Sequence, residues 1–188
     1  MSYQKEEEFK GIDYSIKSFA KGEYENCSFI NCNFTAVDLS NINFIECSFT
    51  DCNFSMARVS NAGFREVSFK GCKLLGMRFE DCNDFLFFVK FDDCVLNLAS
   101  FFKKKLKSTS FKNCSMHEVD FSNCDLSAAL FQNCDLRSAV FDKTILEKAD
   151  LRGAFNFSIN PENNKIKKAK FSREGALGLL DKYNIEIE

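Results

Sequence analysis

The sequence of 188 residues has no tryptophan, one proline, one histidine and eight glycines. It lacks an apolar run approaching 18 residues, which excludes a transmembrane helix. Its first residues, Met1 to Glu8, lack the apolar core of a secretory signal. The glycines form neither a GxGxxG nor a GKS motif, so nothing supports nucleotide binding. We therefore expect one cytoplasmic domain with no membrane contact.

His117 is the only imidazole in the chain, and it follows Met116 on the outward side of its segment. Neighbouring inward positions are apolar, so no serine or cysteine nucleophile has a base within reach. We expect no enzymatic activity, no catalytic residue and no cofactor.

Phenylalanine is abundant, with 23 copies, and large apolar residues recur every five positions. One run extends from Tyr14 to Phe79 and a second, shifted by two residues, from Phe91 to Leu151. A period of five fits neither a helix nor a long strand, so each pentad must be a short extended piece plus a turn. The large residue and the small residue two positions before it share a face and point inward. The sequence predicts a wound chain with stacked columns of phenylalanines and small residues.

All ten cysteines fall on the small inward position of this repeat. Stacked cysteines in register run parallel, whereas a disulfide prefers a torsion near 90°. A zinc site needs four converging ligands, and the spacing of these cysteines is simply that of the repeat. We interpret the thiols as small core residues and expect no metal site. The set is Cys27, Cys32, Cys47, Cys52, Cys72, Cys82, Cys94, Cys114, Cys124 and Cys134.

Segments 36–40 (AVDLS), 124–128 (CDLSA) and 149–153 (ADLRG) resemble the A(D/N)LXX unit of the pentapeptide-repeat family. The resemblance extends over about residues 12–171. In that family four pentads make one square coil of about twenty residues. The resemblance implies an all-β fold, a right-handed quadrilateral β-helix of about seven or eight coils.

Three stretches, 25–34, 44–49 and 97–101, are similar to the quinolone-resistance (Qnr) group within that family. Members of that group are DNA mimics that bind type II topoisomerases. The resemblance implies binding of DNA gyrase or topoisomerase IV and protection against quinolones. Several Qnr proteins carry loops that project from the coils, and this sequence departs from them in two ways. Residues 49–54 continue the pentad repeat through the position of one such loop, and the position of the second holds only a short irregularity at 102–108. The alternative function is an interaction scaffold with an unknown protein partner.

The charges differ in sign between the two halves of the chain. Residues 1–100 carry fifteen Asp and Glu against ten Lys and Arg, a net of −5, and residues 101–188 carry twelve against fifteen, a net of +3. A DNA mimic needs acidic side chains repeated along a rod. A continuous acidic stripe would favour the topoisomerase function, and a charge-mixed surface with an apolar patch at 85–88 would favour the scaffold. Outward carboxylates that could form the partner surface are Asp38, Glu46, Asp51, Glu66, Glu80 and Asp81.

Two lysine clusters lie at 103–107 and 165–170. Lys104 occupies a small inward position, and burying its ammonium unpaired would be costly, so we expect the coil to bulge there and the lysines to reach solvent. Neither cluster has interleaved aromatic residues that could stack on bases, so we expect no direct nucleic-acid binding.

The predicted β-helix covers residues 1–171 and has two interruptions. A register break at about 80–91 predicts a bulge or short loop whose extra aromatic residues fill the core. The alternative is that an exposed Phe85 or Phe87 marks a contact surface. The only proline, Pro161, predicts a loop at about 156–165.

Residues 172–188 predict a cap that closes the exposed end of the solenoid. Ser172 fits the start of a helix reaching about Lys182, and the alternating pattern of the last residues fits a short strand. The resembled family implies a homodimer through this end, and the alternative is a monomer whose cap folds back on its last coil. Residues expected in the cap or dimer contact are Leu177, Leu179, Leu180, Tyr183, Ile185 and Ile187.

Overall fold

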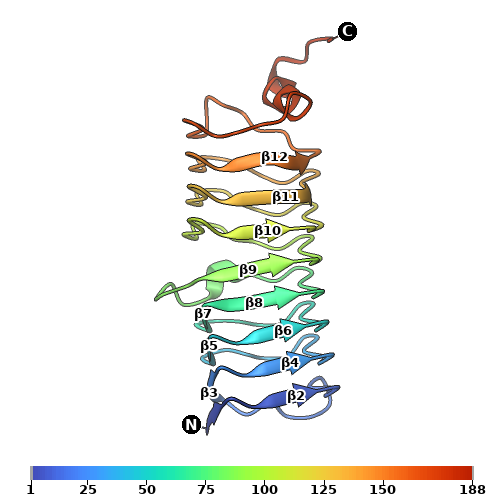
Figure 1. The fold of residues 1–188 in the computed structure, drawn as a ribbon, viewed down its shortest axis with the longest axis vertical. Helices are drawn as coiled ribbons and strands as arrows, with labels where there is room; N and C mark the ends of the chain where they lie inside the picture. The colour runs from blue at the N-terminus through green and yellow to red at the C-terminus, as the bar shows by residue number, and fades with distance from the viewer. Residues whose placement is uncertain (1, 188) are drawn as a thin grey trace.

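The computed structural model describes residues 2–187, which wind into a rod of stacked parallel coils (Figure 1). Residues one coil apart pair in parallel register, as in Phe29 with Phe49 and Phe49 with Phe69. The predicted right-handed β-helix is confirmed: the structure is an all-β parallel solenoid whose longest sheet has eight strands.

Two parallel sheets run along the rod. The four-stranded sheet contains β1 (Ser2–Lys5), β3 (Gly22–Glu25), β5 (Asn43–Ile45) and β7 (Gly63–Arg65). The eight-stranded sheet contains β2 (Glu8–Lys10), β4 (Ser28–Ile30), β6 (Ser48–Thr50), β8 (Val67–Lys70), β9 (Val89–Asp92), β10 (Ser110–Lys112), β11 (Leu130–Asp135) and β12 (Asp150–Phe155). The other two faces are held by isolated parallel bridges, such as Asn33 with Asn53 and Asp38 with Arg58.

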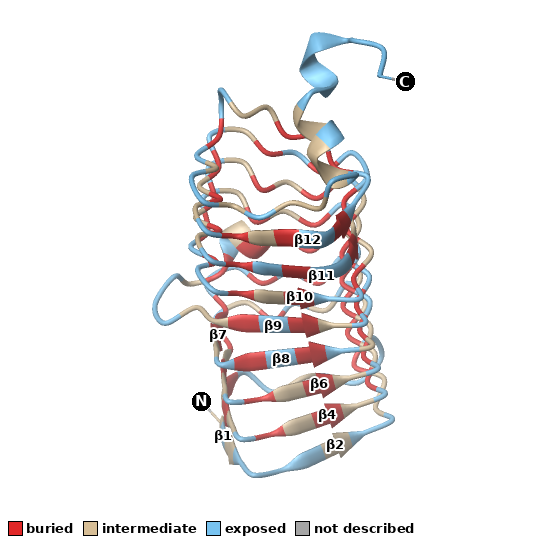
Figure 2. Cartoon of the chain, turned by 45° about the horizontal axis from the view of Figure 1, so that its top comes forward, coloured by how far each residue is buried: buried red, intermediate tan, exposed pale blue. Residues whose placement is uncertain are grey.

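The core of the rod is a set of stacked rings. The centroids of Phe29 and Phe49 are 4.7 Å apart with nearly parallel planes, and Phe34 and Phe54 stack in the same way. Rings on adjacent faces of a coil meet edge to face, a favourable arrangement for the aromatic quadrupole. Figure 2 shows buried positions alternating with more exposed ones along strands such as β8 and β9, as the pentad pattern predicts.

Each corner of the coil is a residue with positive φ, two positions after a large core residue. Asn26, Glu46, Asp51 and Lys148 all adopt this conformation, with φ between 51° and 60°. Asparagine and aspartate enter this region most readily, but the corners here also accept glutamate and lysine.

The register break forms a loop on the face that carries β7. A short 3₁₀ turn, η1 (Phe79–Asp81), precedes it, and β8 pairs with β9 across 22 residues, Val67 with Val89. Residues 83–88, here called the apolar loop, project from the rod in Figure 1 and take the place of a fifth strand beyond β7. Regular spacing of twenty residues then resumes from Phe91 to Phe111.

The C-terminal end carries a cap, but the cap is not the predicted α-helix. The segment forms two short 3₁₀ turns, η2 (Gly175–Leu179) and η3 (Asp181–Tyr183). Ser172 Oγ does accept a hydrogen bond from Gly175 N at 2.9 Å. Two causes keep these turns from forming an α-helix. Gly178 O accepts a hydrogen bond from Ile159 N, which holds the segment against the last coil, and so short a segment has little helical stability of its own.

The predicted terminal strand is also absent, since residues 184–187 have no regular secondary structure. The Pro161 turn precedes a continuing coil, in which Lys165 pairs with Ile145 and Lys170 with Asp150.

Candidate partner-binding surface

The ten thiols are buried, and none is in a disulfide. Several donate weak hydrogen bonds to carbonyl groups of the preceding coil, as Cys52 Sγ does to Phe29 O. Burial raises the pKa of Cys47 and of Cys124 to about 12, so these thiols stay protonated and unreactive at neutral pH. Among residues 2–187, no group of three or more His, Cys, Asp or Glu residues could hold a metal ion.

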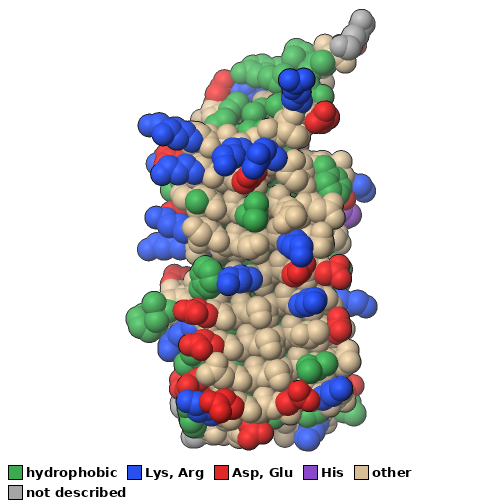
Figure 3. All heavy atoms as spheres, in the orientation of Figure 1, with side chains coloured by type: hydrophobic (Ala, Val, Ile, Leu, Met, Phe, Trp, Pro, Cys, Tyr) green, Lys and Arg blue, Asp and Glu red, His purple; other side chains and the backbone are tan. Residues whose placement is uncertain are grey.

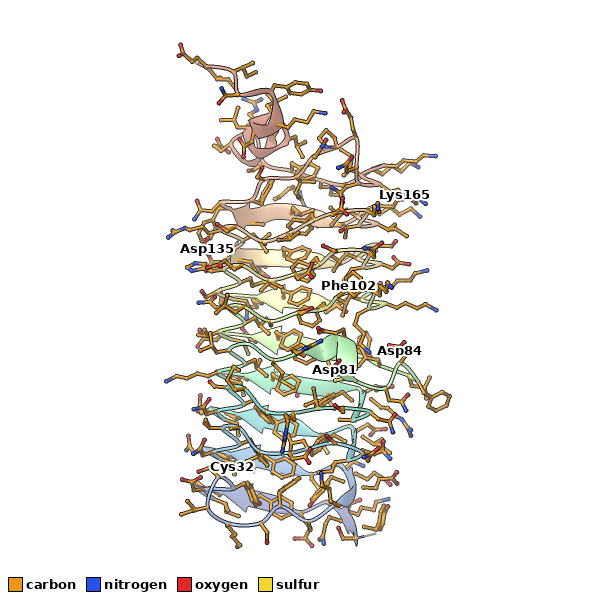
Figure 4. The ribbon with its side chains drawn as sticks, turned by 180° about the vertical axis from the view of Figure 1, so that it is seen from behind. Cys32, Asp81, Asp84, Phe102, Asp135 and Lys165 are labelled. Atoms are coloured by element: carbon orange, nitrogen blue, oxygen red, sulfur yellow. The ribbon has the colours of Figure 1, made fainter. Side chains whose placement is uncertain are left out.

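His117 is half-buried on the side of the rod, and its Nε2 lies 2.8 Å from Asp135 Oδ2. Partial burial raises the pKa of Asp135, but hydrogen bonds from Asn156 and His117 outweigh this effect and lower the pKa below its usual value. Figure 4 shows Asp135 on the opposite edge of the rod from Asp84. The pair therefore braces adjacent coils at the surface.

The six predicted acidic residues do not form one continuous stripe. Asp38 is on a bridge-held face, where Lys21 and Arg58 accompany it at 3.5 and 3.9 Å. Glu80 and Asp81 both contact Arg78. These residues therefore contribute to a charge-mixed surface.

Glu46 and Glu66 are the two predicted residues that the coil brings together. Both occupy the same corner one coil apart, and Glu46 N donates to Arg65 O. Glu6 belongs to this corner as well, because Asn26 lies between it and Glu46 at the same twenty-residue spacing. We call Glu6, Glu46 and Glu66 the acidic edge. Glu6 was not predicted, although counting back by coils from Glu46 would have found it. Asp51 lies on the next corner, after β6.

The apolar loop carries two exposed large side chains at its tip, Phe85 (61% exposed) and Leu86 (65% exposed). Phe87 turns back and packs against the core, 6.5 Å from Phe64 between ring centroids. The Arg65 guanidinium lies over the Phe85 ring at 5.0 Å. The apolar loop therefore contributes Phe87 to the core and exposes Phe85 and Leu86 at its tip.

Lys104 supports this loop from inside the rod, and the predicted bulge at Lys104 is wrong. The side chain is buried, and its ammonium donates to Cys82 O at 2.5 Å and to Asp84 Oδ1 at 2.6 Å. The same group lies over the Phe87 ring at 5.0 Å. The loop thus supplies the partners that a buried ammonium needs, so the coil stays regular. Figure 4 labels Asp84 where the loop leaves the rod.

The remaining lysines of this cluster, Lys103, Lys105 and Lys107, are exposed as predicted. In Figure 3 basic side chains gather along the edge above the protruding loop, and acidic side chains are frequent below it. The loop therefore marks the boundary between the acidic and basic halves of the rod.

At the C-terminal end, Leu179 packs against the core. The other predicted cap or dimer residues are exposed by 37% to 56%. They are Leu177, Leu180, Tyr183, Ile185 and Ile187.

A family model for the pentapeptide repeat region matches residues 22–84 and 86–155. The chain belongs to the pentapeptide repeat family. Two solved structures of QnrB1, a plasmid-mediated fluoroquinolone resistance protein, are similar to this chain. One trypsin-treated form aligns over 100% of both chains with a TM-score of 0.63 and 16% identity. Another aligns over 100% of this chain and 92% of its own, with a TM-score of 0.56 and 18% identity.

HetL, a pentapeptide repeat protein involved in heterocyst differentiation regulation in the cyanobacterium Nostoc sp. strain PCC 7120, aligns at 18% identity. That alignment covers 89% of this chain and 86% of HetL, with a TM-score of 0.48. A search of curated proteins found no match. The likeness to QnrB1 shows a shared fold. No helix among residues 2–187 is both long and apolar enough to cross a membrane.

Proposed function

We propose that this pentapeptide repeat protein is a non-catalytic binding rod of the cytoplasm, which recognises a protein partner through the edge that carries the apolar loop. The observation behind this proposal is the exposure of Phe85 and Leu86 on a loop that Lys104 holds in place. Exposed apolar side chains on a braced support are typical of contact surfaces. The mixed charges on the bridge-held faces favour a general scaffold over a continuous DNA-like stripe.

A quantitative pull-down from the soluble fraction of source cells tests this proposal. The parent protein is compared with Phe85→Ser/Leu86→Ser and with the control Leu130→Ser/Val140→Ser, which removes two exposed apolar residues elsewhere. We expect at least one protein to be enriched by the parent and the control and lost with the loop variant. Equal enrichment by all three would contradict a role for the loop.

A second candidate function is binding of a type II topoisomerase in place of DNA. The net charge of −5 in residues 1–100 supports it, as does the fold shared with QnrB1. The carboxylates of Glu46 and Glu66, which form no ion pair within residues 2–187, also support it. In this mechanism the acidic edge would occupy a positively charged DNA-binding surface, so binding should weaken steeply as salt rises.

Supercoiling by DNA gyrase, titrated with the protein with and without ciprofloxacin, tests this candidate. We expect inhibition or drug protection, lost in Glu46→Lys/Glu66→Lys and retained in Asp93→Lys/Glu118→Lys. All four positions are corners with positive φ, a conformation that Lys148 and Lys168 already adopt, so both variants should fold. No effect of the parent at micromolar concentration would exclude gyrase.

We also propose that the protein forms a homodimer through its C-terminal end. Five exposed apolar side chains between Leu177 and Ile187 support this, because a monomer would leave them in water.

A further inference from the structure

An open groove of about 640 Å³ lies beneath the apolar loop. Its apolar lining comes from Ile45 at the end of β5 and from Leu86, Phe87 and Phe88 of the loop. The groove exists because the chain leaves the rod after Cys82 and returns only at β9, so the loop overhangs the coil below. Such a lining fits one or two apolar side chains of a ligand.

The polar lining of the groove is incomplete in a specific way. Glu46 and Glu66 stand at its margin, and neither has an ion-pair partner within the part of the chain that the structure describes. Arg65 Nε is buried and has no hydrogen-bond partner among those residues, although its guanidinium lies over Phe85.

We propose that this groove binds a short extended segment of a partner protein in which basic and apolar residues alternate. An apolar side chain of the segment lies between Ile45 and Leu86, and its lysines or arginines face Glu46 and Glu66. This inference rests on the proposed binding role, but it does not depend on the partner being a topoisomerase.

Charge decides between the possible occupants. A nucleic acid would bring phosphates against the two glutamates, which repels it. An anionic membrane surface would meet the same repulsion as the loop tip inserted. A basic and apolar peptide instead complements both the carboxylates and the apolar lining of the groove.

Lys104 positions this site from the far side of the loop. It binds Cys82 O and Asp84 and lies under Phe87, so the overhang that forms the groove is fixed before a ligand arrives. A preformed groove lowers the ordering cost of binding.

Fluorescence anisotropy with labelled decapeptides at physiological salt tests the inference directly. The probe alternates leucine with lysine, and its controls alternate leucine with glutamate and serine with lysine. We expect the leucine and lysine peptide to bind at least about tenfold more tightly than either control, the scale of one lost anchor. Leu86→Ser and Glu66→Gln should each weaken binding, whereas Val140→Ser and Glu118→Gln, at exposed sites away from the groove, should not.

Three outcomes would overturn the inference: equal binding of all three peptides, no binding at millimolar peptide, or binding unchanged by Leu86→Ser and Glu66→Gln. Vesicles of phosphatidylcholine and phosphatidylglycerol form a further arm, in which Leu86-dependent binding without peptide preference would make the surface a membrane contact instead. If the peptides fail while the pull-down remains loop-dependent, the proposed function stands and the groove inference falls.

Discussion

Lys104 Nζ lies 2.6 Å from Asp84 Oδ1 and so joins a buried position of one coil to the base of a loop on the coil below. The two side chains differ greatly in environment: the lysine is 2% exposed and the aspartate 81% exposed. The ion pair therefore couples the interior of the rod to its most exposed apolar feature.

Replacing Lys104 by cysteine, the residue found at Cys82 and Cys124 in the same column, should free the loop without disturbing the coil. We expect a loss of about 1–3 kcal/mol in unfolding free energy, since Cys82 O loses its donor while Asp84 remains solvated. Chymotrypsin should cleave the native variant at Phe85 to Phe87 faster than the parent. Lys105→Cys, at an exposed neighbour, is the control, and equal cleavage of both variants would refute the tether.

Two phenylalanines of opposite burial should respond differently to truncation. Phe49→Ala removes a fully buried ring from the stack between Phe29 and Phe69 and should cost about 3–5 kcal/mol. Phe85→Ala should change the unfolding free energy by no more than about 0.5 kcal/mol. Urea denaturation followed by circular dichroism measures both, and similar losses would mean that the loop belongs to the core.

The thiols should be unreactive in the folded protein. All ten are buried, and burial raises the pKa of Cys47 and Cys124 to about 12. Ellman's reagent should therefore detect almost none at neutral pH and ten after denaturation. Rapid native labelling of even two or three would show that the coils open readily or that the cysteines are not core residues.

Aspartates on the faces of the coils should make the rod sensitive to acid. Hydrogen bonds from the side chain and backbone of Ser40 lower the pKa of Asp38 to about 2. Partial burial raises the pKa of Asp125, but hydrogen bonds from Ser127 outweigh this effect and lower the pKa. A lowered folded-state pKa contributes stability that is present above the unfolded value near 4 and lost as pH falls toward 2.

Asp38→Asn/Asp125→Asn should lower the neutral-pH stability by about 1 kcal/mol, because the ionised acceptors are lost, and should lose less stability between pH 4 and pH 2 than the parent. Asparagine suits this position, because Asn33 and Asn53 already accept the equivalent backbone hydrogen bonds. Thermal melts across this pH range give the comparison. An unchanged pH profile would mean that these aspartates do not govern acid unfolding.

The C-terminal contact can be tested by mass. Light scattering should give twice the chain mass of 21.5 kDa for the parent and one chain mass for Leu180→Arg/Ile185→Arg. Both residues are exposed in the single chain, so the variant should keep its fold. A monomeric parent would mean that the cap only closes its own last coil.

Much of the fold could be predicted because each pentad repeats one physical rule. Large residues such as Phe29 and Phe49 point inward at a fixed interval, which indicates a wound chain with stacked columns. The twenty-residue length of one coil was implied by the resemblance to the pentapeptide-repeat family. The break near Phe85 was visible for the same reason, as a departure from that interval.

Sequence reasoning failed where contacts between coils decide the structure. The burial of Lys104 depends on Cys82 O and Asp84, which become its partners only once the loop has formed. The cap follows the close contact of Gly178 with the Phe157 backbone, where a Cβ would lie 2.1 Å from Phe157 O, and not its own helical pattern. The six predicted acidic residues do not form one stripe, because position within a coil, and not position in the sequence, determines which of them become neighbours.

Photocrosslinking from the apolar loop can capture a partner that contacts Leu86. A benzophenone amino acid at position 86, compared with one at position 140, is irradiated in soluble extract of source cells, and the products are identified by mass spectrometry. We expect a discrete crosslinked protein from position 86 that is absent from position 140 and lost in Lys104→Cys. The same products from both positions, or none from position 86, would contradict the assignment of the apolar loop as the partner-binding surface.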